Sequence, residues 1–178
     1  GFRVRPVYQH KFHGYPRASQ LTGNDKLRQL YGVYEGIEDA LREMDAKHVD
    51  SLRDLLATLE SATEELDEVK DGYEESASNI EDGFGHATEA SEAAQENAES
   101  VESAQSEMRD AADNLGAAVQ ALEESIDALE KVGIQAPGDI PEGGTLSPDQ
   151  ESAMADYRSV VADIESSLSE IEDLNCPL

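Results

Sequence analysis

The sequence has no tryptophan and only one cysteine, and aromatic residues make up 5% of its 178 positions. A lone cysteine, Cys176, excludes an internal disulfide framework. No stretch approaches the roughly 18 consecutive apolar residues that a membrane-spanning helix requires. The shortage of large aromatic side chains also disfavours a thick globular core. These absences predict a soluble chain, either cytoplasmic or part of a virion or other large assembly, with no insertion into a membrane.

Basic residues are scarce as well, with 13 Lys and Arg against 40 Asp and Glu and a net charge of −27. Such a charge makes the folded chain repel itself, and the screening length falls from about 8 Å at physiological salt to about 3 Å at 1 M. We therefore expect the protein to be more stable at high salt. The composition resembles that of proteins from salt-loving (halophilic) organisms, although a Glu-rich coiled coil would have the same character.

Proline is absent between Pro16 and Pro137, and apolar residues in this span recur at alternating steps of three and four. This is the a/d pattern of a coiled coil, whose apolar positions form a continuous seam along one side of each helix. Two seam positions are filled by Ser91 and Gln105. The runs that keep the pattern are Leu27–Met44, Leu52–Tyr73 and Phe84–Leu129.

The phase of this pattern slips twice, around His48 and around Ile80, where consecutive seam positions are four and four residues apart. Such stutters locally unwind a supercoil. The second slip lies beside Gly83 and Gly85, and glycine weakens a helix by roughly 1 kcal/mol. We therefore expect an antiparallel hairpin that turns near residues 83–85. A straight rod through the two glycines is the alternative.

The helix ends carry recognisable signals. The first helix has Thr22 and Asp25 at capping-box spacing, with Asn24 as a rival cap. The second ends with Lys131 in its last turn, followed by Gly133 and Ile134. A third helix starts at Ser147, Pro148 and Gln150, which match a cap, the first helical position and the capping-box partner.

These signals predict an all-α fold: an elongated antiparallel coiled-coil hairpin with a shorter third helix. At 1.5 Å per residue the first helix would be roughly 85 Å long, the second roughly 70 Å and the third about 40 Å. The third helix would therefore cover only the lower hairpin, giving a three-helix base below a two-helix projection. The predicted segments are an extended N-terminal arm 1–24, hairpin 25–132, Gly/Pro linker 133–147, third helix 148–174 and tail 175–178.

The N-terminal arm differs from the rest of the chain, because it has four basic residues, no acid and a concentration of aromatic side chains. An acidic protein surface is its simplest partner, either on another copy of this chain or on an assembly scaffold, with the aromatic residues as anchors. Folding of the arm back onto the base of its own chain is the alternative. The strongly acidic remainder argues against binding to nucleic acid or to a membrane surface. The expected contact residues of the arm are Phe2, Arg3, Arg5, Tyr8, Phe12, Tyr15 and Arg17.

Motifs of enzyme chemistry are missing from the sequence. It has no HExxH, no Gly-rich phosphate loop, no GxSxG and no CxxC pair. His10 and His13 lack the further ligands that a zinc site needs. We therefore assign no catalytic residue, metal ligand or cofactor and expect a protein that is not an enzyme. Gly32 and Gly36 have a GxxxG spacing, which predicts close packing of this helix against another near the base.

An anchoring arm on a helical rod indicates a structural subunit of a larger assembly, for example a virion spike, tail or head-decoration component. The alternative is a soluble adaptor or chaperone-like regulator that binds a partner through its helical seam or through the tip of the hairpin at Phe84. A mimic of DNA would explain the acidic charge, but not the arm or the long regular seam.

Overall fold

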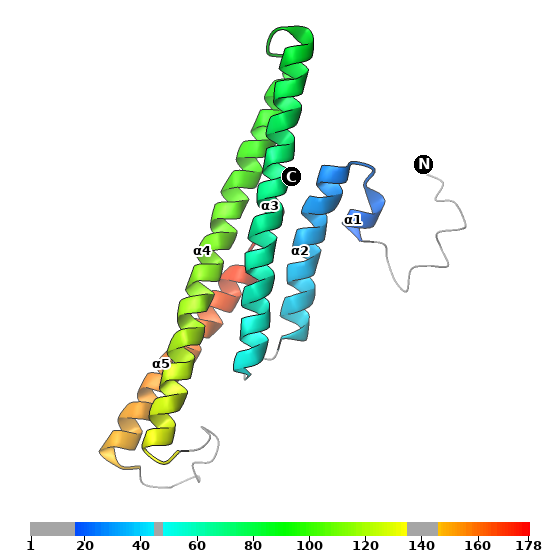
Figure 1. Ribbon diagram of the computed structural model, residues 1–178. Helices are drawn as coiled ribbons and strands as arrows, with labels where there is room; N and C mark the ends of the chain where they lie inside the picture. Colours follow the sequence, from blue (N-terminus) through cyan, green and yellow to red (C-terminus); the bar gives the residue numbers. More distant parts are fainter. Residues whose placement is uncertain (1–16, 45–47, 135–145) are drawn as a thin grey trace, which may run out of the picture.

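The computed structural model describes residues 17–44, 48–134 and 146–178. Every regular element within these residues is an α-helix, so the predicted all-α class is confirmed. Figure 1 shows an elongated arrangement in which two long helices form the axis of the molecule. The helices are α1 Ala18–Leu21, α2 Asp25–Glu43, α3 Val49–Phe84, α4 Glu89–Lys131 and α5 Pro148–Glu172.

The axis is formed by α3 and α4, which are 36 and 43 residues long and therefore about 54 and 64 Å. The chain reverses after Phe84, where Gly85 has φ +72° and ends α3 in the left-handed conformation that glycine adopts without strain. The two helices then run antiparallel (Figure 1). Their register is marked by the amide of Gln105, which donates to the carbonyl oxygen of Thr63 over 3.0 Å.

A second reversal separates α2 from α3, where the sequence predicted one continuous helix. The residues on either side, Met44 and His48, have extended backbone angles. An unbroken helix from residue 25 to 84 would be about 90 Å long and would extend about 25 Å beyond α4. The apolar stripe on the protruding part of this helix would then face water. Folding back places α2 along α3 and buries Leu30 and Ile37 to 0% and 3% exposure, so the first stutter marks a chain reversal.

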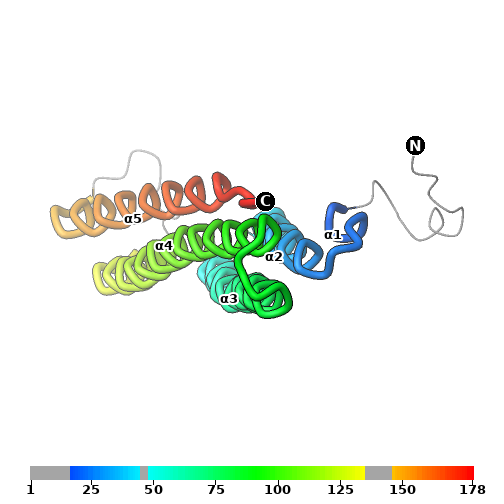
Figure 2. Tube along the Cα trace, turned by 90° about the horizontal axis from the view of Figure 1, so that it is seen from above, coloured from blue at the N-terminus to red at the C-terminus, as the bar shows by residue number. Residues whose placement is uncertain are grey.

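The shorter helix α5 runs antiparallel along the lower part of α4. Asn114 Nδ2 donates to Glu170 Oε2 over 3.1 Å near one end of the contact, and Gln150 Nε2 donates to the carbonyl oxygen of Val132 over 3.1 Å near the other. Seen from above in Figure 2, α2 and α5 lie beside different members of the α3–α4 pair. The predicted three-helix base therefore has a fourth helix, α2.

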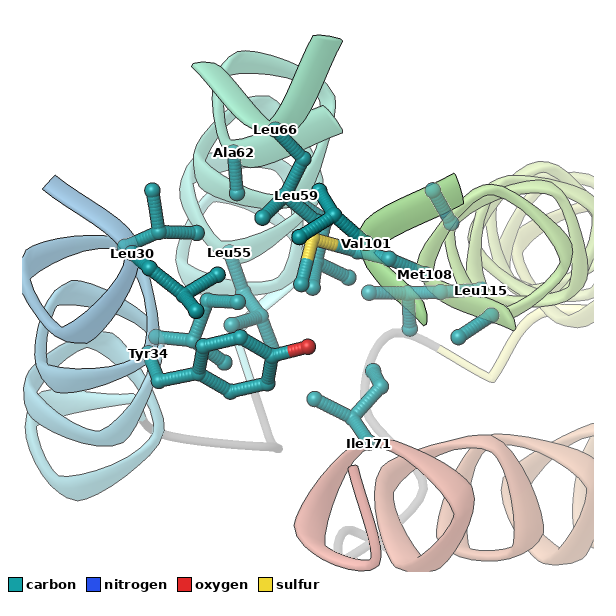
Figure 3. Packing of buried hydrophobic residues seen from close by; sticks show 14 of the residues in the cluster. Leu30, Tyr34, Leu55, Leu59, Ala62, Leu66, Val101, Met108, Leu115 and Ile171 are labelled. Atoms are coloured by element: carbon teal, nitrogen blue, oxygen red, sulfur yellow. The ribbon is translucent and has the colours of Figure 1, made fainter. Parts of the chain in front are cut away.

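One continuous core joins all four long helices. Figure 3 shows leucines of α3 meeting Leu30 and Tyr34 of α2, Met108 of α4 and Ile171 of α5. Burying one leucine side chain contributes about 1.5–3 kcal/mol to the stability of the folded state. The buried polar seam residue Gln105 bonds to Thr63, as described above, so its burial does not leave the amide without a partner. A smaller cluster around Leu129 closes the lower end.

The caps follow the sequence signals with one correction. Asn24, rather than Thr22, caps α2, and its Oδ1 accepts hydrogen bonds from the backbone N–H groups of Lys26 and Leu27. At the end of α4, Gly133 has φ +83° and the N–H of Ile134 donates to Leu129 over 2.9 Å. The predicted capping box of α5 is also present.

Candidate functional site

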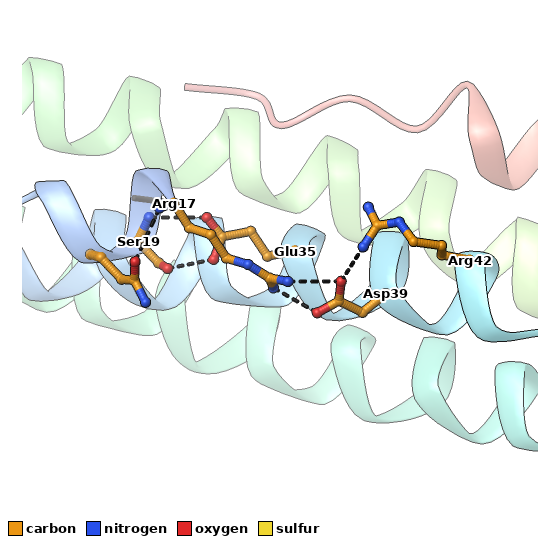
Figure 4. A network of polar contacts seen from close by, with 6 residues as sticks. Arg17, Ser19, Glu35, Asp39 and Arg42 are labelled. Atoms are coloured by element: carbon orange, nitrogen blue, oxygen red, sulfur yellow. Dashed lines mark hydrogen bonds and ion pairs between the residues drawn. The ribbon is translucent and has the colours of Figure 1, made fainter. Parts of the chain in front are cut away.

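Arg17, which we call the root of the N-terminal arm, is fixed to the helical body of the protein by an ion pair. The guanidinium of Arg17 donates to both carboxylate oxygens of Asp39 over 2.6 and 2.9 Å, and Arg42 donates to the same carboxylate over 2.7 Å (Figure 4). Hydrogen bonding by Arg17 lowers the pKa of Asp39 from its usual value, and Arg42 acts in the same direction. The first described residue of the chain is thus anchored to α2.

A second contact holds α1 against the same side of α2. The backbone N–H of Ser19 donates to Glu35 Oε1 over 3.2 Å, and its hydroxyl donates to the other carboxylate oxygen. In Figures 1 and 2, α2 separates α1 from the α3–α4 pair. The predicted extended arm is therefore wrong for residues 18–21, which form one helical turn because Glu35 and Asp39 supply polar partners.

Of the seven contact residues expected in the arm, the structure describes only one. Arg17 lies within the described residues and is paired with its own chain. The other six expected contacts, Phe2, Arg3, Arg5, Tyr8, Phe12 and Tyr15, lie outside the described residues. The sequence reasoning missed Glu35 and Asp39, which receive the root. Their spacing of four residues places them one turn apart on α2, but acids at this spacing are common in the chain.

The C-terminal tail lies close to this root. Cys176 and Leu178 pack against the core, and a hollow of about 330 Å³ is lined by Arg17, Tyr34 and Cys176 among others. Burial, followed by the influence of Cys176, raises the pKa of Tyr34 to about 12. Burial also raises the pKa of the Cys176 thiol. A thiol with a raised pKa is a weak nucleophile at neutral pH, so this cysteine has the character of a packing residue.

A separate groove lies between α2 and α3 at the glycine pair noted in the sequence. It encloses about 330 Å³, and its walls include Gly32 and Gly36 on one side and Ala57 and Ser61 on the other. A Cβ atom built at either glycine would meet nothing within 4 Å. The predicted role of the pair in close helix packing is therefore wrong within this chain. Each glycine destabilises α2 by about 1 kcal/mol relative to alanine, and no contact with α3 requires it.

The tip of the α3–α4 pair presents one large apolar side chain. Phe84 is 67% exposed, and its ring lies 6.4 Å from that of His86 in an edge-to-face arrangement. The carbonyl oxygen of Phe84 accepts a hydrogen bond from His86 Nδ1 over 2.9 Å. The sequence pattern counted Phe84 and Ala87 as the first members of a buried seam, but both are exposed because the turn begins there.

Below the tip, on the α3–α4 pair, is a smaller notch of about 180 Å³. Ala77 and Ala98 form its apolar part, and Glu74, Glu99 and Glu102 lie around it. The small residues leave room beside the two helices, and the carboxylates make the notch acidic. It is a surface feature without a buried polar group directed into it.

Within residues 17–44, 48–134 and 146–178, no group of three His, Cys, Asp or Glu side chains is placed to hold a metal ion. None of the helices in the same ranges has both the length and the apolar character needed to cross a membrane. Comparison with known proteins found no matching family model, curated protein or solved structure.

Proposed function

We propose that this chain is a non-enzymatic structural subunit, attached through its N-terminal segment to a larger assembly made of its own copies and a scaffold protein. A virion spike, tail or head-decoration component is the concrete form of this proposal. It would be a soluble protein or a part of such a particle, and it would need no cofactor.

The observation that supports the proposal is the contrast between residues 1–16 and the body to which they are joined. This segment contains three of the 13 basic residues, none of the 40 acidic residues and four of the nine aromatic residues. The body at neutral pH is therefore strongly acidic, with a charge of −30. The point where residues 1–16 join this body is held in place by the bidentate ion pair between Arg17 and Asp39. A basic, aromatic segment with a fixed exit point suits attachment to an acidic protein surface.

Sedimentation of particles from the source organism tests this proposal. A tagged full-length chain is expected to sediment with a large assembly in a fixed ratio to the other components. A chain lacking residues 1–16 is expected to remain in the free fraction, while its helical content by circular dichroism is unchanged. Equal incorporation of the two chains into the assembly would refute the proposal.

A soluble adaptor or chaperone-like regulator is the second candidate, and the exposed side chain of Phe84 supports it. In this case the protein would be found free in extract, and the tip would bind a partner helix. Replacing Phe84 with Ser is expected to abolish partner capture without loss of stability, because the ring is exposed. If capture depends on residues 1–16 and not on Phe84, the structural proposal is favoured.

A further inference from the structure

We propose that the groove between α2 and α3, at Gly32 and Gly36, is the docking site for residues 1–16 of a second copy of this chain. The inference rests on the proposed function, because it names the surface to which the N-terminal segment attaches. The occupant would be a basic, aromatic segment of 16 residues that includes Pro6 and Pro16.

The groove itself has the form of a vacant contact surface. Gly32 and Gly36 are both exposed on α2, and a side chain at either position would enter open space. Across the groove, Ala57 and Ser61 are exposed small residues of α3, and Ala62 is buried at its floor. Glycine and alanine keep this surface low enough for a bulky side chain from another molecule. Aromatic rings fill such hollows well, because they bury a large area with few rotatable bonds.

The distribution of charge indicates which part of a second copy would bind in the groove. Two bodies that each carry −30 repel one another, so a helix-to-helix contact between bodies is disfavoured. Residues 1–16 are the one long stretch with an excess of positive charge, supplied by Arg3, Arg5 and Lys11. No basic residue lines the groove, and Glu65 stands exposed at its edge. The attraction is therefore between the segment and the acidic body around the groove.

Photo-cross-linking in the full-length protein distinguishes the possible occupants. Copies with Phe12→p-benzoylphenylalanine at natural isotope abundance are mixed with unmodified copies labelled with ¹⁵N, and cross-linked peptides are identified by mass spectrometry. The proposal predicts links to labelled peptides that contain Gly32–Gly36 or Ala57–Glu65. Links confined to unlabelled peptides would mean that the segment docks on its own chain, which overturns the inference. Links to labelled peptides elsewhere would also overturn it, but would leave the proposed function standing.

Filling the groove provides the second test. Gly36→Leu is expected to raise the apparent dissociation constant of self-association at least tenfold in light scattering, because the leucine occupies the space of the incoming ring. Gly83→Leu is the matched control, since Gly83 is also a helical glycine with open space around it but lies near the tip. It should leave self-association unchanged. Equal self-association of wild type and Gly36→Leu would overturn the inference, whereas the proposed function fails only if deletion of residues 1–16 leaves incorporation into the assembly unchanged.

Discussion

The side chain of Lys26 crosses the surface of α3 so that its ammonium nitrogen lies 4.9 Å from the centroid of the Tyr73 ring. The same nitrogen donates a hydrogen bond to Ser76. The methylene groups pass over Gly72, where an added Cβ would lie 3.2 Å from Lys26 Cε. Gly72 therefore lies at a close crossing of α2 and α3.

Replacing Lys26 with Met should therefore destabilise the protein by about 0.5–1 kcal/mol, the usual size of a cation–π interaction at a partly exposed site. Methionine keeps the apolar stem over Gly72 but removes the ammonium group. Urea unfolding followed by circular dichroism measures the change. Arg158→Met is the control, because it makes the same change in net charge at an exposed position of α5. Equal effects of the two substitutions would show that net charge, rather than the contact, is responsible.

Truncation of Leu66 to Ala should reduce the free energy of unfolding by about 2–5 kcal/mol, because Leu66 of α3 is fully buried in the main core cluster. Leu21 has the same side chain but is 65% exposed. Its replacement by Ala should change stability by less than about 0.5 kcal/mol. Thermal and urea unfolding of the two variants compare the positions directly, and a small effect at Leu66 would contradict the packing of the core.

The phenol of Tyr34 should make the protein sensitive to alkali. Its pKa is raised to about 12 in the folded protein, from about 10 in an unfolded chain. The folded state therefore favours the neutral phenol, and its contribution is fully present below pH 10 and is lost as the pH rises towards 12. Tyr34→Phe should unfold less readily than the wild type between pH 10 and 12. Tyr157→Phe is the control. An equal gain in stability between pH 10 and 12 from that substitution would contradict the assignment of the effect to Tyr34.

The ion pair at the arm root predicts the opposite pH dependence for Asp39. Its folded pKa is lowered by Arg17, so its contribution to stability is present above the unfolded pKa of about 3.9 and is lost as the pH falls through the folded value. Titration of the Asp39 carboxyl by NMR should show a lowered pKa in the wild type and a higher one in Arg17→Gln. An unchanged pKa in the variant would contradict the contact. Arg158→Gln controls for the loss of one positive charge.

Salt should stabilise the protein, because the chain has a net charge of −27 and its helices, which carry the acidic residues, lie close together. Raising sodium chloride from 0.15 M to 1 M shortens the screening length from about 8 Å to about 3 Å. The midpoint of thermal unfolding is expected to rise with sodium chloride. Chloride is preferred to sulfate for this measurement, since sulfate also strengthens apolar burial. A midpoint that falls with salt would mean that local ion pairs outweigh the overall repulsion.

Periodicity and capping chemistry were sufficient to predict the helical class and several helix ends. Gly133 and Ser147 act through local backbone geometry, which neighbouring residues determine. The reversal between α2 and α3 was not predictable in the same way. A stutter is compatible with either a bend or a continuous helix, and the choice depends on whether Leu30 finds a partner that is distant in the sequence.

The candidate surfaces were predicted less well, for a related reason. The two glycines at positions 32 and 36 were visible in the sequence, but whether they face a helix or open space depends on the rotation of α2 about its axis. Among 40 acidic residues, nothing marks Glu35 and Asp39 as the partners of the arm root. In the structure Phe84 is the last residue of α3, and its exposure follows from the exact start of the turn.

The fold-back of α2 also determines how the molecule would respond to mechanical force. A pull applied through residues 1–16 enters at Arg17 and reaches α3 only through α2, whose covalent connection to α3 is at its far end. The ion pair of Arg17 with Asp39 and the contact of Ser19 with Glu35 would open first. α2 would then peel away from its Lys26 end towards Met44. The 19 residues of α2 would then extend to about 60 Å at roughly 3.3 Å per residue. The α3–α4 pair would remain folded, so α2 would act as an extensible tether in series with a stiff rod.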